Sequence, residues 1–177
     1  SSDLNEIIAY EHYLNIGKLE GRKINNLEEK RVEEARRVAT EAGSQRVVIS
    51  IVMAYYNRKS QTLETLKGFE RMYAGKYDFE VVIVDDNSND ENILEEDIKQ
   101  FSFPINLIVI SAEEKGNRVN PCVAYNKGFA YAKGEIIIIQ NPECYHVGDI
   151  IGHVSTNLGE QDYYSYSCFT ANSPEIT

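Results

Sequence analysis

Four short runs of β-branched, largely apolar residues recur along this chain, and they restrict its fold more than any other feature. They cover 47–54, 79–84, 107–110 and 136–139. Runs of this length and composition are typical of strands that are buried on both faces of a sheet. Segments of helical character separate them, so the pattern predicts an α/β domain with a mostly parallel sheet and helices on both faces.

The predicted helices carry local start and stop signals. Ser60 is expected to cap a helix that ends near Tyr73, and Asn120 to cap a helix that ends at Lys133, with Pro121 at its first position. Two further helices and a last strand complete the pattern, at 93–101, 148–158 and 163–169.

The first part of the chain differs in composition from the rest. Residues 1–45 are charged, and a thin apolar stripe of mostly small residues ends at Gly43. We therefore expect two parts, a helical extension over 1–45 and the α/β domain over 46–177.

Charge and composition exclude several classes of function. The 177 residues carry a formal net charge of −10, which argues against nucleic acid as a partner. No apolar run approaches the roughly 20 residues of a membrane-spanning helix, and the start of the chain lacks the features of a signal peptide. Three scattered cysteines favour free thiols in a reducing compartment. The sequence thus predicts a cytoplasmic protein without a membrane span.

Polar side chains gather after the ends of the predicted strands. These clusters follow Ala54, Val84, Ile110 and Ile139. Ligands of parallel sheets bind at the carboxyl ends of the strands, so a polar ligand is expected at this edge.

The order of motifs at these strand ends resembles the inverting glycosyltransferase family 2, which has the GT-A fold. The motifs are S-I-V-x-A-Y-Y-N-R, V-I-V-D-D-x-S-x-D and N-x-G-x-A-x-A-K-G-E-I-I-I-I. The resemblance implies transfer of a sugar from a UDP-sugar to a hydroxyl of a glycan, protein or lipid acceptor, with inversion.

The resemblance also implies roles for particular residues. One carboxylate of Asp85 and Asp86 would accept the uracil N3–H in a pocket at the end of the first strand. Asn141 and Glu143 occupy the position of the family's D-x-D metal motif, where Glu143 would coordinate Mn²⁺ or Mg²⁺. The remaining residues of the implied donor site are Ala54, Tyr55, Asn57, Arg58, Asn117 and Arg118.

Two positions depart from the family pattern. Asn141 is an amide where the family has a carboxylate, and Tyr125 stands where many relatives have an arginine. Neutralisation of the diphosphate would then fall to Arg118, Lys115 or Arg58.

No catalytic base is recognisable in this chain. The acids after Glu143 do not lie in a G-F-D-E-like stretch; they are Asp149, Glu160, Asp162 and Glu175. We expect the base outside this chain, which would then be the N-terminal part of a longer catalytic domain.

Several alternatives stay open. Asp85 and Asp86 can be turn residues, and Asn141–Glu143 an ordinary turn. His146 is interpreted as a lone surface imidazole, His153 as structural and Asp149 as a helix-start residue. The alternation at 163–167 favours a half-buried strand over a sugar-stacking surface.

Two other functions compete with a transferase. The first is a GT-A-like module that binds nucleotide or serves as a scaffold without catalysis. The second is a dinucleotide-binding oxidoreductase, but no G-x-G-x-x-G follows the first strand and no P-loop motif occurs.

Overall fold

The fold is a four-stranded parallel sheet with helices on both faces, as the sequence predicts. In the computed structural model, residues 49–168 are described, so the predicted helices of 1–45 lie outside the described residues. The sheet has the order β3-β2-β1-β4, with every neighbouring pair parallel. Its strands are β1 (Ile49–Tyr55), β2 (Phe79–Asp85), β3 (Ile105–Val109) and β4 (Ile136–Ile139).

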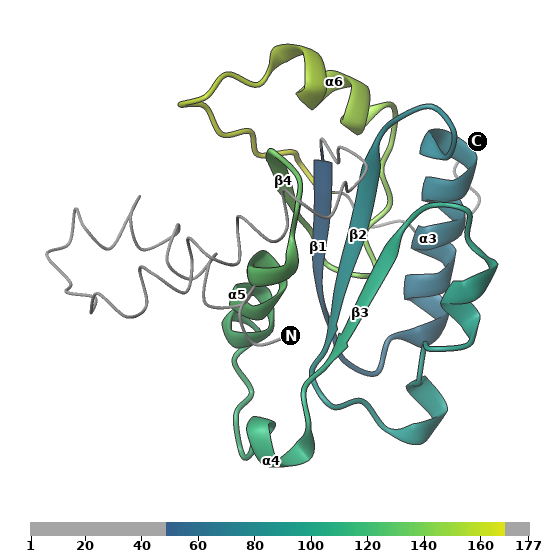
Figure 1. Ribbon diagram of the computed structural model, residues 1–177, viewed down its shortest axis with the longest axis vertical. Coiled ribbons are helices and arrows are strands. Elements are labelled where there is room, and N and C mark those ends of the chain that lie inside the picture. Colours follow the sequence, from purple (N-terminus) through teal and green to yellow (C-terminus); the bar gives the residue numbers. More distant parts are fainter. Residues whose placement is uncertain (1–48, 169–177) are drawn as a thin grey trace, which may run out of the picture.

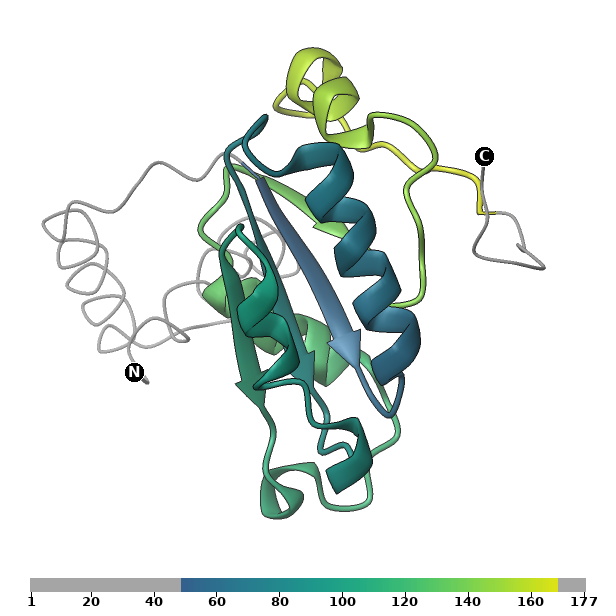
Figure 2. The same ribbon diagram turned by 90° about the vertical axis from the view of Figure 1, so that its right-hand side faces the viewer.

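The two long helices lie on opposite faces of the sheet (Figures 1 and 2). One face packs against α3 and α6, and the other face packs against α5. The helices are α3 (Lys59–Tyr73), α4 (Ala112–Lys115), α5 (Cys122–Tyr131) and α6 (Ile150–Asn157), with 3-10 turns η2 (Asp90–Asn92) and η3 (Asp97–Gln100).

Strand alternation decides which side chains face which helix. Ile51 and Met53 of β1 join the cluster under α3, whereas Val52 joins the cluster under α5, and all three are fully buried. Because adjacent side chains of a strand point to opposite faces, this register also sorts the polar residues at the strand ends.

Helix α3 packs through residues spaced by three or four, as an amphipathic helix does. It begins two residues earlier than predicted: Arg58 holds the N-cap position, without a side-chain cap. The prediction that Ser60 caps this helix is therefore wrong, because Ser60 lies within its first turn and its hydroxyl donates to Gln61 instead.

Two other local predictions are also wrong. The segment 93–101 is not one helix: Ile93 is extended, and only the short η3 follows it. The segment 163–168 joins no strand ladder among the described residues, and Tyr163 is 85% exposed, so it is not a half-buried strand.

Helix α5 approaches the sheet closely because two positions have no side chain. A Cβ on Gly128 would lie 2.5 Å from Val52 Cγ1, and a Cβ on Gly134 would lie 2.4 Å from the Ser50 nitrogen. The two glycines of the third motif therefore set the distance between α5 and β1.

A buried polar cluster fixes the end of this helix to the sheet. The Ser50 hydroxyl donates to Glu80 Oε1 at 2.7 Å, and the amides of Lys133 and Gly134 donate to Glu80 and Ser50 at 2.7 and 2.8 Å. These bonds give a buried carboxylate the partners it needs.

Strand β4 forms one edge of the sheet. On its α5 face, Ile137 and Ile139 are 40% and 60% exposed. Within residues 49–168, no helix has the length and apolar character that crossing a membrane requires.

Candidate functional site

The loops after β1 and β2 are fastened to each other at the carboxyl edge of the sheet. The Asn57 amide donates to Ser88 Oγ, and Asn57 Oδ1 accepts from the Asn89 amide, both at 2.9 Å. Asn57 has a φ of 50°, a left-handed conformation that asparagine tolerates better than most residues. Asn57 thus shapes this edge.

Asp85 and Asp86 have different surroundings because they point to opposite faces. Asp85 is 5% exposed, and its Oδ1 accepts the Ser88 amide at 2.8 Å. Asp85 therefore organises the turn after β2, as the structural alternative held. Asp86, on the α5 side, is half-buried, with 16% of its side chain exposed.

A lysine and an exposed aromatic ring accompany Asp86. Lys115 Nζ lies 3.3 Å from Asp86 Oδ2, donates to the Asp86 carbonyl, and lies 3.7 Å from the centroid of the Tyr56 ring. Tyr56 is 51% exposed. Tyr56 was not among the predicted site residues. The alternation of side chains along the first strand could have predicted that Tyr56, unlike Tyr55, faces away from the buried core under α3.

Tyr55 is placed differently from the expectation. Its side chain is fully buried in the cluster under α3, and its hydroxyl donates to the Asn92 carbonyl at 2.6 Å. Burial raises the pKa of Tyr55 to about 12. The structure therefore gives the Tyr55 side chain a packing role, while Ala54 stands at the edge beside Tyr125.

Of the cationic and amide groups predicted for the diphosphate, Arg118 has the most unusual surroundings. Its Nη1 donates to the Glu114 carbonyl, but Nε and Nη2 are buried without a hydrogen-bond partner. Buried donors of this kind usually have a partner. Arg58 and Asn117 are exposed.

The predicted metal motif forms a tight turn after β4. The Cys144 amide donates to the Asn141 carbonyl at 3.1 Å, and Pro142 and Glu143 are the two central residues. Asn141 and Glu143 are exposed. The Tyr125 hydroxyl lies 3.0 Å from Asn141 Oδ1 and 3.1 Å from the Gln140 carbonyl, so Tyr125 orients this turn.

This turn offers oxygen ligands only. Among residues 49–168, no three His, Cys, Asp or Glu side chains gather as a metal-binding group. The amide oxygen of Asn141 and the carboxylate of Glu143 still suit a hard divalent cation that takes its other ligands from phosphates and water. The residues therefore fit such an ion in donor chemistry.

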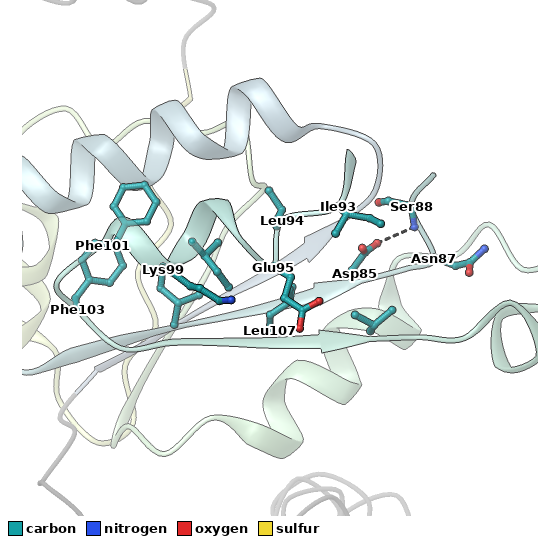
Figure 3. Close-up of a pocket in the computed structure, with 13 residues that line it drawn as sticks. Asp85, Asn87, Ser88, Ile93, Leu94, Glu95, Lys99, Phe101, Phe103 and Leu107 are labelled. Atoms are coloured by element: carbon teal, nitrogen blue, oxygen red, sulfur yellow. Dashed lines mark hydrogen bonds between the residues drawn. The ribbon is translucent and has the colours of Figure 1, made fainter. Parts of the chain in front are cut away.

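A well-defined groove lies elsewhere on the described residues. It is a groove of about 630 Å³ along β3 and the 3-10 turns, on the α3 face (Figure 3). Its lining is mainly apolar, and of the predicted site residues only Asp85 contributes to it. The groove thus follows from the irregular 90–103 segment, and the other predicted donor residues lie outside it.

The histidines and Asp149 differ in how well their roles were predicted. Asp149 Oδ1 accepts the Gly152 amide at 2.9 Å, which confirms it as a helix-start residue. The Lys76 ammonium holds the pKa of Asp149 at about 2, so Asp149 is a poor base. His146 is not a surface residue, because its ring is enclosed by Phe69 and Tyr73. His153 is exposed.

A parallel α/β sheet with carboxylate, amide and cationic groups at its carboxyl edge has its candidate ligand site where domains of this class bind their ligands. The sequence matches the Glycosyl transferase family 2 over residues 50–170, and the chain belongs to this family. A comparison with curated proteins gives no significant match.

Solved structures of glycosyltransferases share the fold. S. aureus TarS 1–349 in complex with UDP is 20% identical with a TM-score of 0.54, covering 62% of this chain and 31% of that one. The same protein with UDP-GlcNAc is 20% identical with a TM-score of 0.52, covering 62% and 30%. The chain thus spans under a third of the length of these structures. Mannosyltransferase PcManGT from Pyrobaculum calidifontis, with GDP-Man and Mn²⁺, is 17% identical with a TM-score of 0.46, covering 80% and 40%.

Proposed function

We propose that this chain carries the donor-binding part of an inverting glycosyltransferase that uses a UDP-sugar and a divalent cation, Mn²⁺ or Mg²⁺. Asp86 is the observation that carries the proposal. It is a half-buried carboxylate at the carboxyl edge of the sheet, next to an exposed ring, in a chain of the Glycosyl transferase family 2. Complexes of TarS with UDP and UDP-GlcNAc support a uridine donor.

In this proposal the uracil ring of the donor is recognised by hydrogen bonding and stacking. The uracil N3–H donates to the Asp86 carboxylate while the ring lies against Tyr56. Stacking of a base on an aromatic ring contributes about 1–3 kcal/mol. Lys115, already beside both residues, and the unpartnered nitrogens of Arg118 supply positive charge for the diphosphate.

Asn141 and Glu143 would hold the divalent cation, which when bound stabilises the negative charge on the departing UDP. Tyr125 keeps Asn141 Oδ1 oriented through its hydroxyl. A glycan, protein or lipid hydroxyl would then attack the anomeric carbon in line and invert it. The base that deprotonates this hydroxyl would come from sequence outside this chain.

Calorimetric titration of UDP and CDP into the chain tests the role of Asp86. Cytosine presents an acceptor at N3, so UDP should bind more tightly than CDP. Asp86→Asn should lower UDP affinity about tenfold, because the acceptor of the N3–H loses its charge and the hydrogen bond is weakened. Asp90→Asn, an exposed carboxylate with the same charge change, is the control. Equal binding of UDP and CDP would refute the recognition of uracil by Asp86.

The same titration with and without Mn²⁺ tests the metal assignment. Glu143→Gln keeps the size of the side chain but removes its charge, and should abolish the gain in UDP affinity on adding Mn²⁺. Glu160→Gln, an exposed acid beyond α6, is the matched control. If manganese strengthens UDP binding equally in both variants, Glu143 is not the metal ligand.

A nucleotide-binding module without turnover is the second candidate. The amide at Asn141 favours it, since a single carboxylate binds a cation more weakly than two. Release of UDP from a UDP-sugar by a longer chain that includes this domain would decide for the transferase.

A further inference from the structure

The loop that carries the Asn141–Cys144 turn is seated along helix α3. We call residues 140–149 the return loop, because it leads from the end of β4 back to α6, at the opposite end of the sheet from α4 (Figures 1 and 2). Its contacts follow α3 in order. Cys144 meets Thr65, Tyr145 lies over Gly68, and His146 meets Phe69 and Tyr73.

His146 is the central contact of the return loop with α3. Its ring centroid lies 5.0 Å from that of Phe69 and 5.6 Å from that of Tyr73. Its Nδ1 lies 2.8 Å from the Tyr73 hydroxyl oxygen. Burial lowers the pKa of His146 to about 4, so the ring is neutral near pH 7.

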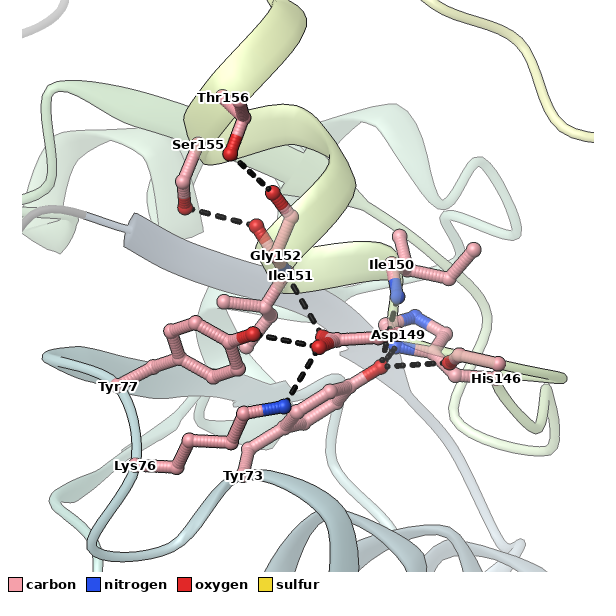
Figure 4. Close-up of polar contacts among 11 residues, drawn as sticks. Tyr73, Lys76, Tyr77, His146, Asp149, Ile150, Ile151, Gly152, Ser155 and Thr156 are labelled. Atoms are coloured by element: carbon pink, nitrogen blue, oxygen red, sulfur yellow. Dashed lines mark hydrogen bonds and ion pairs between the residues drawn. The ribbon is translucent and has the colours of Figure 1, made fainter.

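The Tyr73 hydroxyl ties three points of the chain together (Figure 4). Besides His146 Nδ1, it contacts the Gly148 carbonyl and the Ile150 amide, both at 3.3 Å. A phenol has one proton, so one arrangement serves all three contacts. His146 Nδ1–H and the Ile150 amide donate to the oxygen, and the hydroxyl donates to the Gly148 carbonyl.

On the α5 side the Tyr125 hydroxyl contacts Gln140 and Asn141, but on the α3 side the other contacts that fasten the turn are weaker. Thr65 Oγ1 lies 3.4 Å from the Cys144 carbonyl, longer than a well-formed hydrogen bond. Gln140 Nε2 reaches the same carbonyl at 3.1 Å, but from within the return loop itself. The Tyr73–His146 pair is therefore the principal connection between residues 144–148 and α3, whereas Asp149, at the end of the return loop, is held separately by Lys76 and Tyr77.

We propose that Tyr73 and His146 are positioning residues that hold the Asn141–Glu143 turn in place for the donor complex. The inference rests on the proposed function of that turn. Neither side chain touches the donor. They act because Glu143 lies three residues before His146, so freedom at His146 becomes freedom at the carboxylate. Groups that orient a metal ligand typically contribute about 10–100-fold to metal affinity.

Three variants of the full chain test the proposal. Tyr73→Phe removes one oxygen and keeps the packing of the ring. Tyr164→Phe removes a hydroxyl that donates to the Asn157 carbonyl, outside the return loop, and is the matched control. His146→Asn keeps a hydrogen-bonding group near the position of Nδ1 and is the conservative variant. Thermal unfolding of each confirms that it is folded.

Two readouts are combined. Hydrogen–deuterium exchange of peptides from 140–149 reports the order of the return loop without any ligand. Tyr73→Phe should speed this exchange about fivefold, the factor of one hydrogen bond. UDP titration with and without MnCl₂ reports how strongly manganese increases UDP affinity. Tyr73→Phe should weaken the gain in UDP affinity from manganese about tenfold and leave metal-free UDP affinity unchanged. Tyr164→Phe should behave like wild type, and His146→Asn should be intermediate.

The outcomes separate this inference from the proposed function. Unchanged exchange in Tyr73→Phe overturns the inference whatever UDP does. Faster exchange with an unchanged manganese effect also overturns it, because order in the return loop would then not matter to the site. A wild-type chain whose UDP binding ignores manganese refutes the metal assignment, and with it the positioning role, while the exchange data still show whether the pair orders the turn.

Discussion

Gly128→Ala tests whether the glycine of the third motif serves packing. A Cβ at this position would lie 2.5 Å from Val52 Cγ1 and 3.2 Å from Val84 Cγ2, against about 3.5–4.0 Å for carbon atoms in ordinary contact. Val52 and Val84 are fully buried in the sheet and cannot move aside. Overpacking of this kind costs about 1–3 kcal/mol.

Helix propensity acts in the opposite direction, and Gly68→Ala measures that contribution. Exchanging glycine for alanine within a helix gains about 1 kcal/mol, so the net loss for Gly128→Ala is about 0–2 kcal/mol. Gly68 lies within α3, where a Cβ would be 3.9 Å from Tyr145 Cδ1, an ordinary contact. Gly68→Ala should therefore stabilise the chain by about 1 kcal/mol.

The assay is urea unfolding of the two variants and the wild type, followed by circular dichroism. The difference between the two variants, about 1–3 kcal/mol, isolates the packing cost because the propensity gain cancels. If both variants gained the same free energy of unfolding, the close approach of α5 to β1 would be wrong.

Two further predictions concern the same layers. Gly134→Ala should destabilise by about 3 kcal/mol or more in the same urea assay, since its Cβ would lie 2.4 Å from the Ser50 backbone nitrogen; a loss smaller than that of Gly128→Ala would contradict this. The pKa of His146 is lowered from 6.5 to about 4, so the unfolded state binds more protons between these values and stability falls by about 3 kcal/mol as pH drops through that window. Unfolding free energies at pH 7 and pH 4.5 should show about 2 kcal/mol of this loss in the wild type and a smaller loss in His146→Asn.

The sheet was predictable because its signal is local. Each strand is a run of β-branched residues, and β4 has the limits that the sequence predicts, Ile136–Ile139. The prediction of a helix at 93–101 was wrong. Its spacing of apolar residues, Leu94 and Ile98, reflects their packing against the core that includes β3 and not one face of a continuous helix. Tertiary packing there determines the backbone more than helix propensity does.

The candidate site was predictable in place but not in detail. The topology brings Ala54, Asp86 and Asn141 to the carboxyl edge, as expected. Strand alternation buries Tyr55 and leaves Tyr56 exposed. The period of two along the first strand could have predicted this difference from the sequence. His146 carried no local signal, since its partner Tyr73 is 73 residues away in sequence.

The isoleucines of β4 have a consequence for how this chain behaves in solution. Within residues 49–168, β4 has a strand neighbour on one side only, and Ile137 and Ile139 form an exposed apolar strip on it, the arrangement through which sheets of separate molecules join. Self-association of this kind favours the folded state by mass action, so the apparent unfolding midpoint would rise with protein concentration. Dilution series therefore belong with every stability comparison made on this chain.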